Sequence, residues 1–92
     1  MLAQELELHL PHAQSLKDKR SVLTSMLAGA RRRFGVAAAE VGWQDHRQRA
    51  LLGFAVVAST AGHAGEVMDE VDRFVWSHPE VEVLSTERRW LE

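Results

Sequence analysis

The chain has 92 residues, of which 46% are hydrophobic and 26% charged, and it carries a formal net charge of −2 at neutral pH. This composition is typical of a globular protein and lies outside the range of disordered chains. Because the chain has no cysteine, disulfides, thiol nucleophiles and cysteine-ligated zinc are excluded. The length predicts one domain over residues 1–92.

The N-terminal segment MLAQELELHL places glutamates where a signal peptide needs an uninterrupted apolar core. Elsewhere, no run of residues approaches the roughly 20 apolar residues of a membrane span. We therefore expect a cytoplasmic protein with no membrane partner.

The first third of the chain predicts a strand followed by a helix. Leucines alternate with polar residues over residues 2–10, which is the period of a half-buried strand. Ser15 and Asp18 predict a helix N-terminus close to a capping box. Apolar side chains then recur at helical spacing as far as Phe34, and Gly35 is expected to cap the C-terminus. The predicted helix has about five turns.

The rest of the chain predicts two strands, a second helix and a last strand. Residues 36–43 and 49–59 are expected to be strands joined by the polar turn QDHRQ, and the second of them is apolar on both faces. Apolar residues from Val67 to Val75 predict an amphipathic helix that ends near Pro79. Residues 81–91 are expected to form the final strand.

This order of elements predicts an α+β fold of the ferredoxin-like βαββαβ type, with two helices on one face of a four-stranded antiparallel sheet. Since crossover connections are right-handed, the first and second strands should be parallel with the third between them. The expected core includes Leu6, Leu8, Leu23, Leu27, Phe34, Val71 and Val75.

Positive charge is concentrated in the first predicted helix. Residues 15–34 carry six cationic side chains and one acid, a net charge of +5, so the remaining residues carry −7. Residues 60–78, in the second helix, are acidic. Either the two helices lie side by side and compensate each other, or the basic helix faces a polyanionic partner.

The segment SLKDKR holds both lysines of the chain, at a helix N-terminus that already presents positive charge. On a helical wheel, Lys19 and Arg20 flank the apolar stripe and Lys17 points outward. Lys19 and Arg20 could therefore reach sheet carboxylates such as Glu40 or Glu82. Alternatively, the three cations bind a phosphate together with free backbone N–H groups.

The predicted topology brings distant cations together at the two ends of the domain. The start of the first helix and the turn between the second and third strands share one end, and the other end is expected to gather Arg31, Arg32, Arg33, Arg88 and Arg89. Arginines at a helix C-terminus also stabilise the helix without any ligand. The candidate anion- or RNA-binding residues are Lys17, Lys19, Arg20, Arg47, Arg49, Arg31, Arg32 and Arg33.

Two stretches of the chain, SLKDKR and VAAAEVGWQDHRQRALLGFAVVAS, resemble the YlxP-like family of small bacterial proteins, a domain of unknown function. The resemblance covers nearly the whole chain. It implies a ferredoxin-like fold and genes that often neighbour those of translation initiation and ribosome maturation factors. It implies no activity and no catalytic residue. His46 stands in a turn where relatives often place an aromatic residue.

Signatures of catalysis are weak in this sequence. We find no nucleophile beside a base, no Gly-rich phosphate loop and no GxSxG turn. Acylphosphatases share the predicted fold, but their motif needs an asparagine and the chain has none. The His9 and His12 pair spans Pro11, which breaks the helix that gives such spacing its meaning for metal binding. We expect a protein that is not an enzyme and has no metal or cofactor.

Three hypotheses for function follow. The first is an RNA- or ribosome-associated accessory factor that uses the basic helix, because the first strand offers Glu5 and Glu7 rather than the stacking aromatics of RNA-recognition domains. The second is a homo-oligomeric interaction module that uses the sheet. One apolar set of the third strand, either Leu52, Phe54 and Val56 or Leu51, Ala55 and Val57, must lie on the helix-free face. The third is a small-anion sensor at the start of the first helix.

Overall fold

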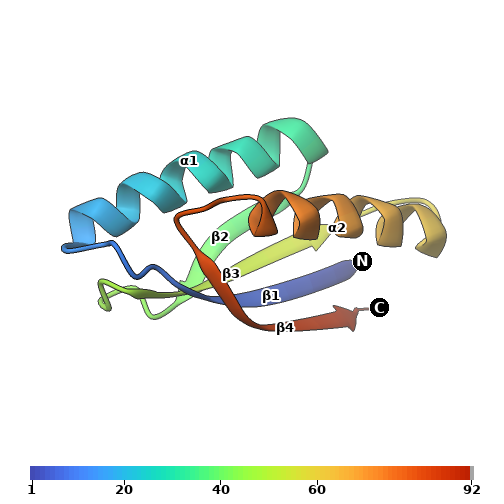
Figure 1. The fold of residues 1–92 in the computed structure, drawn as a ribbon. Coiled ribbons are helices and arrows are strands. Elements are labelled where there is room, and N and C mark those ends of the chain that lie inside the picture. The colour runs from blue at the N-terminus through green and yellow to red at the C-terminus, as the bar shows by residue number, and fades with distance from the viewer. Residues whose placement is uncertain (92) are drawn as a thin grey trace.

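The computed structural model describes residues 1–91, with six elements in the predicted order (Figure 1). They are β1 (Leu2–His9), α1 (Leu16–Phe34), β2 (Ala37–Gly42), β3 (Arg49–Val56), α2 (Ala61–Trp76) and β4 (Glu82–Trp90). The strands form one sheet in the order β2-β3-β1-β4, and each neighbouring pair is antiparallel. β3 therefore separates the parallel strands β1 and β2. The predicted ferredoxin-like fold is confirmed.

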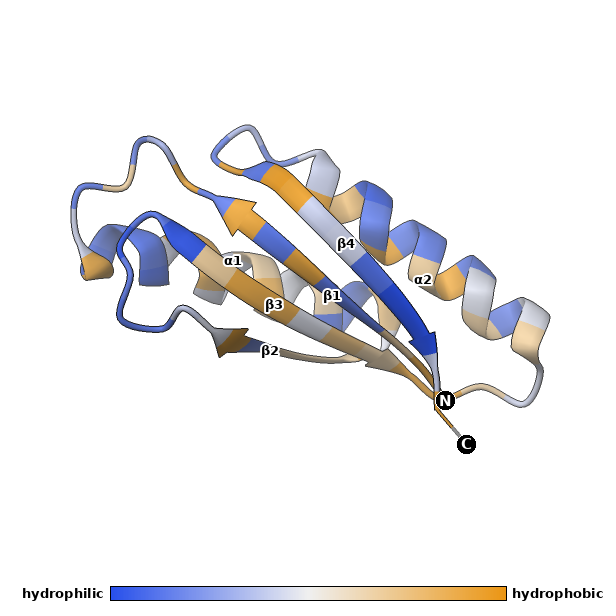
Figure 2. Ribbon diagram, turned by 90° about the horizontal axis from the view of Figure 1, so that it is seen from below, coloured by the Kyte–Doolittle hydropathy of each residue, from blue (hydrophilic) through white to orange (hydrophobic). Residues whose placement is uncertain are grey.

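Both helices cover the same face of the sheet and leave the other face open, as a comparison of Figures 1 and 2 shows. The alternation of burial along β3 decides which of its two apolar sets faces the helices. Leu52, Phe54 and Val56 are buried beneath the helices, while Leu51 and Ala55 lie on the open face. The helices cover only one face of β3, so its second set of apolar side chains is not needed for the core. Leu51 and Ala55 are therefore available for contact with another molecule.

The core fills the space between the helices and the sheet. Each predicted core residue is buried except Phe34, which is half-buried and packs edge-to-face on Phe74 with 5.6 Å between ring centroids. Gly29 lets the Phe74 ring lie close to the backbone of α1, because a Cβ atom at residue 29 would lie 2.9 Å from that ring. Full burial of each large aliphatic side chain contributes about 1.5–3 kcal/mol.

The ends of α1 follow the local signals in the sequence. The Oγ of Ser15 accepts a hydrogen bond from the backbone N–H of Asp18 at 3.1 Å, and the Asp18 carboxylate accepts one from the N–H of Gln14 at 3.0 Å. At the other end, Gly35 has a φ of 64° and its N–H donates to the Arg31 carbonyl at 3.0 Å. These hydrogen bonds confirm both predicted caps. The caps could be predicted because the residues that form them act within a single turn.

Candidate functional site

Lys19 is fully buried one turn into α1. Its ammonium group donates to the backbone carbonyls of Trp43 at 2.8 Å, Gln44 at 3.2 Å and Arg49 at 3.1 Å. The Glu40 carboxylate lies 2.9 Å from the same nitrogen. An ammonium has three N–H donors, so the carbonyls use all of them and Glu40 serves as the counter-charge. In agreement with this, Glu40 Oε2 is buried and makes no hydrogen bond.

The environment of Lys19 separates the two explanations of SLKDKR. The predicted pairing with Glu40 is confirmed, and Lys19 has no donor left for an anion, so it is removed from the candidate binding residues. The predicted pairing of Arg20 with a sheet carboxylate is wrong for Glu82, which lies on the opposite edge strand and contacts His9 at 3.3 Å. Arg20 and Lys17 are both exposed. A small-anion site here would have two cations instead of three.

The loop between β2 and β3 carries an exposed tryptophan in an unusual conformation. Trp43 has a φ of 60°, in the left-handed region, which costs a bulky residue roughly 1–2 kcal/mol. Its ring packs edge-to-face on His46, with 5.9 Å between centroids, and the Arg49 guanidinium lies 5.2 Å from the ring centroid. Arg49 is fixed in turn by an ion pair with Glu7 on β1. Trp43 nevertheless stays 49% exposed.

The start of α1 and the β2–β3 loop share one end of the molecule, as the topology predicted. A hollow of ≈ 540 Å³ is lined by both, including Ser15 of the α1 cap and Arg47 of the loop. The Gln48 side chain ties the loop to the segment before α1 by donating to the carbonyls of Pro11 and Ala13. Arg47 is exposed, and within residues 1–91 it forms no ion pair.

The solvent face of α1 carries cations at both ends and hydroxyl groups between them. Lys17 and Arg20 are exposed in the first two turns, and Arg31, Arg32 and Arg33 are exposed in the last. Between these clusters Ser21, Thr24 and Ser25 are exposed. The sequence from residue 19 to residue 39 contains no Asp or Glu. The outer surface of α1 therefore carries positive charge at both ends and no carboxylate between them.

The acidic residues of α2 do not neutralise α1. Asp69 pairs with Arg88 of β4 at 2.9 Å, and Asp72 accepts a hydrogen bond from Gln4 of β1 at 2.8 Å. Glu70 pairs with Arg73 of its own helix. Across the part of the chain that the structure describes, the one ion pair that involves α1 is the buried Lys19–Glu40 pair. Direct compensation between the two helices is therefore not how the charge of α1 is balanced.

The arginines at the other end do not form the single cluster that the topology predicted. The Arg31 side chain donates to the carbonyl of Ala38 on β2, and the Arg33 guanidinium lies 5.3 Å from the centroid of the Phe74 ring. Arg88 and Arg89 belong to β4. Arg88 pairs with Asp69 of α2, whereas Arg89 lines a hollow on the open face of the sheet, so Arg89 and the α1 arginines lie on opposite sides of the sheet (Figures 1 and 2).

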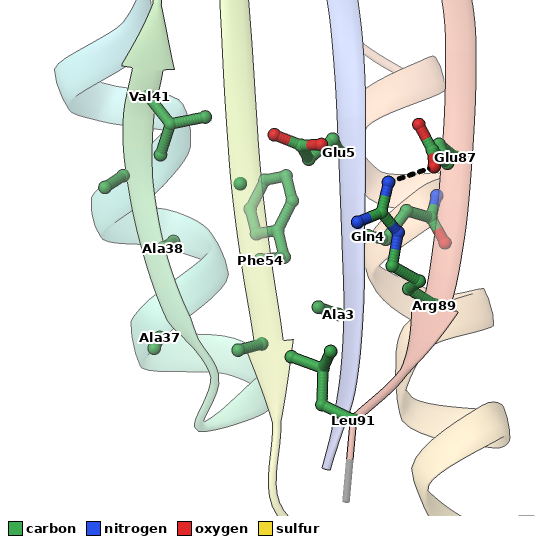
Figure 3. Close-up of a pocket in the computed structure, with 13 residues that line it drawn as sticks. Ala3, Gln4, Glu5, Ala37, Ala38, Val41, Phe54, Glu87, Arg89 and Leu91 are labelled. Carbon is green, nitrogen blue, oxygen red and sulfur yellow. Dashed lines mark hydrogen bonds and ion pairs between the residues drawn. The ribbon is translucent and has the colours of Figure 1, made fainter.

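A shallow hollow of ≈ 430 Å³ lies on the open face of the sheet (Figure 3). Its floor consists of small residues from three strands, and Val41 and Leu91 stand at its margins. Its polar side is formed by Glu5, Glu87 and Arg89. The hydrogen bond and negative charge of Glu87 raise the pKa of Arg89 above its ordinary value, so Arg89 remains charged. The floor residues are Ala3, Ala37, Ala39, Gly53 and Ala55.

Sequence reasoning identified neither this hollow nor the exposure of Trp43. The signal for the hollow was present as alternating Ala and Gly residues in the second and third strands, which leave space wherever a larger side chain would fill the face. The signal for Trp43 was its position at the end of the predicted strand 36–43, directly before the polar turn QDHRQ.

Residues 1–91 contain no group of three or more His, Asp or Glu side chains placed to share a metal ion. No helix in this range is both long enough and apolar enough to cross a membrane.

These features define a small ferredoxin-like α+β protein with a basic helix and an open sheet face. A family model described as "Protein of unknown function (DUF503)" matches residues 1–88. The chain is also 36% identical over 86 residues to "Uncharacterized protein YlxP" of Bacillus subtilis (strain 168), and the match covers 94% of each chain. The chain therefore belongs to this family, which confirms the resemblance noted from SLKDKR and the following strands.

Proposed function

We propose that this protein is a non-enzymatic, cytoplasmic RNA- or ribosome-associated accessory factor that binds RNA phosphates along the solvent face of α1. The observation that carries the proposal is that the exposed cations of α1 have no carboxylate partner within residues 1–91, although the chain as a whole is acidic. A positive surface on an acidic protein steers a polyanion to one face. The gene neighbourhood that the family resemblance implies supports the same function.

The dimensions of α1 suit several phosphate contacts. Lys17 and Arg31 are 14 residues apart, which corresponds to roughly 21 Å along the helix. The exposed hydroxyls of Ser21, Thr24 and Ser25 lie between the two cationic clusters, and Ser and Thr side chains commonly donate to phosphate oxygens. Contacts of this type set affinity and orientation without reading sequence.

Other surfaces are less suited to RNA. The open sheet face carries Glu5, Glu7 and Glu87, and the outer face of α2 carries Glu66 and Glu70. Carboxylates at these places would repel phosphates. The distribution of charge therefore favours α1 as the RNA-binding surface. RNA-recognition domains of similar topology instead use the sheet.

A salt series with purified small and large ribosomal subunits and with deproteinised ribosomal RNA tests the proposal. The variant K17Q/R20Q removes two exposed cations and leaves the structural Lys19 intact. We expect weaker binding and a slope of log K against log salt that is shallower by about 0.7–0.9 for each phosphate that the variant no longer neutralises. The matched control R73Q/R89Q removes the same charge from other surfaces and should bind like the wild type.

Two outcomes would contradict the proposal. Wild-type protein that binds neither ribosomal subunits nor RNA at low salt would exclude it. Equal reductions of affinity in K17Q/R20Q and in R73Q/R89Q would show that only net charge matters and that α1 is not the interface.

A second function, homo-oligomeric interaction through the open sheet face, is favoured by the hollow on that face. Its floor is apolar, and Val41 and Leu91 at its margins are 47% and 40% exposed. Apolar side chains of one copy could pack into the hollow of a second copy. Exposed apolar surface of this kind often marks an interface. We expect A55E, which places a charge on the floor, to abolish self-association in sedimentation velocity. A wild-type monomer at several hundred micromolar would exclude this function.

A further inference from the structure

Trp43 combines two features that are each unfavourable for a tryptophan. Its backbone is in the left-handed region, with a φ of 60°, and about half of its surface is exposed to solvent. Neither feature contributes to the core, which lies between the helices and the sheet. Strained residues that persist in a fold are concentrated at binding and catalytic sites, where the surrounding structure enforces them.

The buried lysine enforces the conformation of this loop. Lys19 donates to the carbonyls of Trp43 and Gln44 at the start of the loop and to that of Arg49 at its end. Glu40 supplies the counter-charge at 2.9 Å. Both ends of the loop are therefore attached to α1 through one ammonium group, and the backbone of Trp43 is fixed before any ligand arrives.

The indole ring is also held in place. The His46 ring packs against it at an interplanar angle of 86°, and the Arg49 guanidinium lies 5.2 Å from the indole centroid. The ion pair with Glu7 anchors Arg49. Beside the indole, a hollow of ≈ 430 Å³ is lined by Trp43, Gln44, Asp45 and His46. A rigid, exposed aromatic ring with open space beside it loses little entropy when a second planar group stacks on it.

The charges at this end favour an anionic ligand. Lys17, Arg20 and Arg47 are exposed, whereas Lys19 and Arg49 are paired with carboxylates. At this end of the molecule the exposed Glu80 and Glu82 lie at the start of β4, two strands away from β3, and Glu82 contacts His9. The acids of the β2–β3 loop and of the first turn of α1 are Asp45, which is exposed, and Asp18, whose carboxylate accepts the Gln14 N–H. Three exposed cations against these two carboxylates leave a positive surface around the indole. A ligand with both a planar ring and a phosphate matches this chemistry.

We propose that Trp43 stacks on an unpaired base of RNA whose backbone follows α1, so that the β2–β3 loop selects single-stranded over double-stranded RNA. This inference rests on the proposed function and adds to it the kind of RNA that is bound. Stacking on an aromatic side chain requires a base that is free of its own helix, as in a loop, a bulge or an end. Lys19 and Glu40 act as positioning residues for the ring and do not contact the RNA.

Fluorescence anisotropy with a labelled 12-nucleotide oligouridine and with an RNA duplex of equal length tests this inference. W43A should bind the single strand roughly 5- to 150-fold more weakly, which is the range for removal of one stacked base, and its salt slope should not change. W43F keeps a stacking ring and should retain most of the affinity. W76A is the matched control, because Trp76 is a similarly exposed indole (58%) on α2. Urea unfolding of each variant shows that it is folded.

A direct readout comes from W76F/W90F, in which Trp43 is the only indole. Its emission should be quenched when oligouridine is added and should not change with the duplex. If wild-type protein binds RNA but W43A and W76A bind the single strand equally, stacking is refuted and the proposed function stands. If W43A loses affinity equally for single strand and duplex, base stacking is also refuted. If the wild type binds neither oligouridine nor the duplex, stacking is refuted, and the salt series with ribosomal subunits and ribosomal RNA decides the proposed function separately.

Discussion

Replacing Lys19 with methionine removes the ammonium group that joins α1 to the β2–β3 loop while keeping a side chain of similar length. Three backbone carbonyls lose their donor, and the Glu40 carboxylate loses the one counter-charge it has within residues 1–91. Removing one partner of a buried ion pair costs about 3–5 kcal/mol, because the other charge is left desolvated. Glu40 retains 18% side-chain exposure, so some water can reach it, and we expect a cost of about 3 kcal/mol, at the lower end of that range.

This loss is large beside the total stability of about 5–15 kcal/mol for a small domain. With a shift in melting temperature of roughly 4–8 °C per kcal/mol for a chain of this size, K19M should melt at least about 12 °C below the wild type. E40Q should cost less, about 1–2 kcal/mol, because Lys19 then keeps its three carbonyl acceptors. The two partners are therefore predicted to be unequal, with the lysine the more important.

Urea unfolding of the wild type, K19M, E40Q and K19M/E40Q forms a double-mutant cycle. The double variant should be more stable than the sum of the single losses predicts, since it no longer buries an unpaired carboxylate. K17M is the control, as Lys17 lies two residues away and is exposed, and its change should stay within about 0.5 kcal/mol. If K19M loses no more stability than K17M, the buried pair does not anchor this loop and does not hold Trp43 in place.

Two further variants test the fold. L27A truncates a core side chain that is 8% exposed and should lower the free energy of unfolding by about 2–5 kcal/mol; a loss below about 0.5 kcal/mol in urea would mean that the apolar stripe of α1 is misplaced. G35A forces a Cβ into the left-handed conformation of the α1 cap, where φ is 64°, and should cost about 1–2 kcal/mol by thermal unfolding, whereas an unchanged midpoint would argue that the cap is not needed.

The sequence by itself determined the features that depend on near neighbours. Periodicity separated strands from helices, and Ser15 and Gly35 marked the ends of α1, because caps act within one turn of the backbone. The strand order followed from the handedness of the crossover connections. A pairing of Lys19 with a sheet carboxylate, Glu40 or Glu82, could be predicted as one of two alternatives, since the helical wheel turns Lys19 toward the sheet that its apolar neighbours must cover.

Only the tertiary structure decided the features that depend on the register of the strands and on which side chains distant in sequence come into contact. Both faces of β3 are apolar, so its sequence alone could not say which set would be covered, and the pairing with β1 settled the choice. Arg20 and Arg33 have the same charge as Lys19, but their directions from α1 leave them exposed. The sequence pattern makes Trp43 the last residue of a predicted strand, and only the structure shows that the ammonium of Lys19, 24 positions earlier, binds its carbonyl. Contacts of that range are set by the packing of whole elements, which no local pattern encodes.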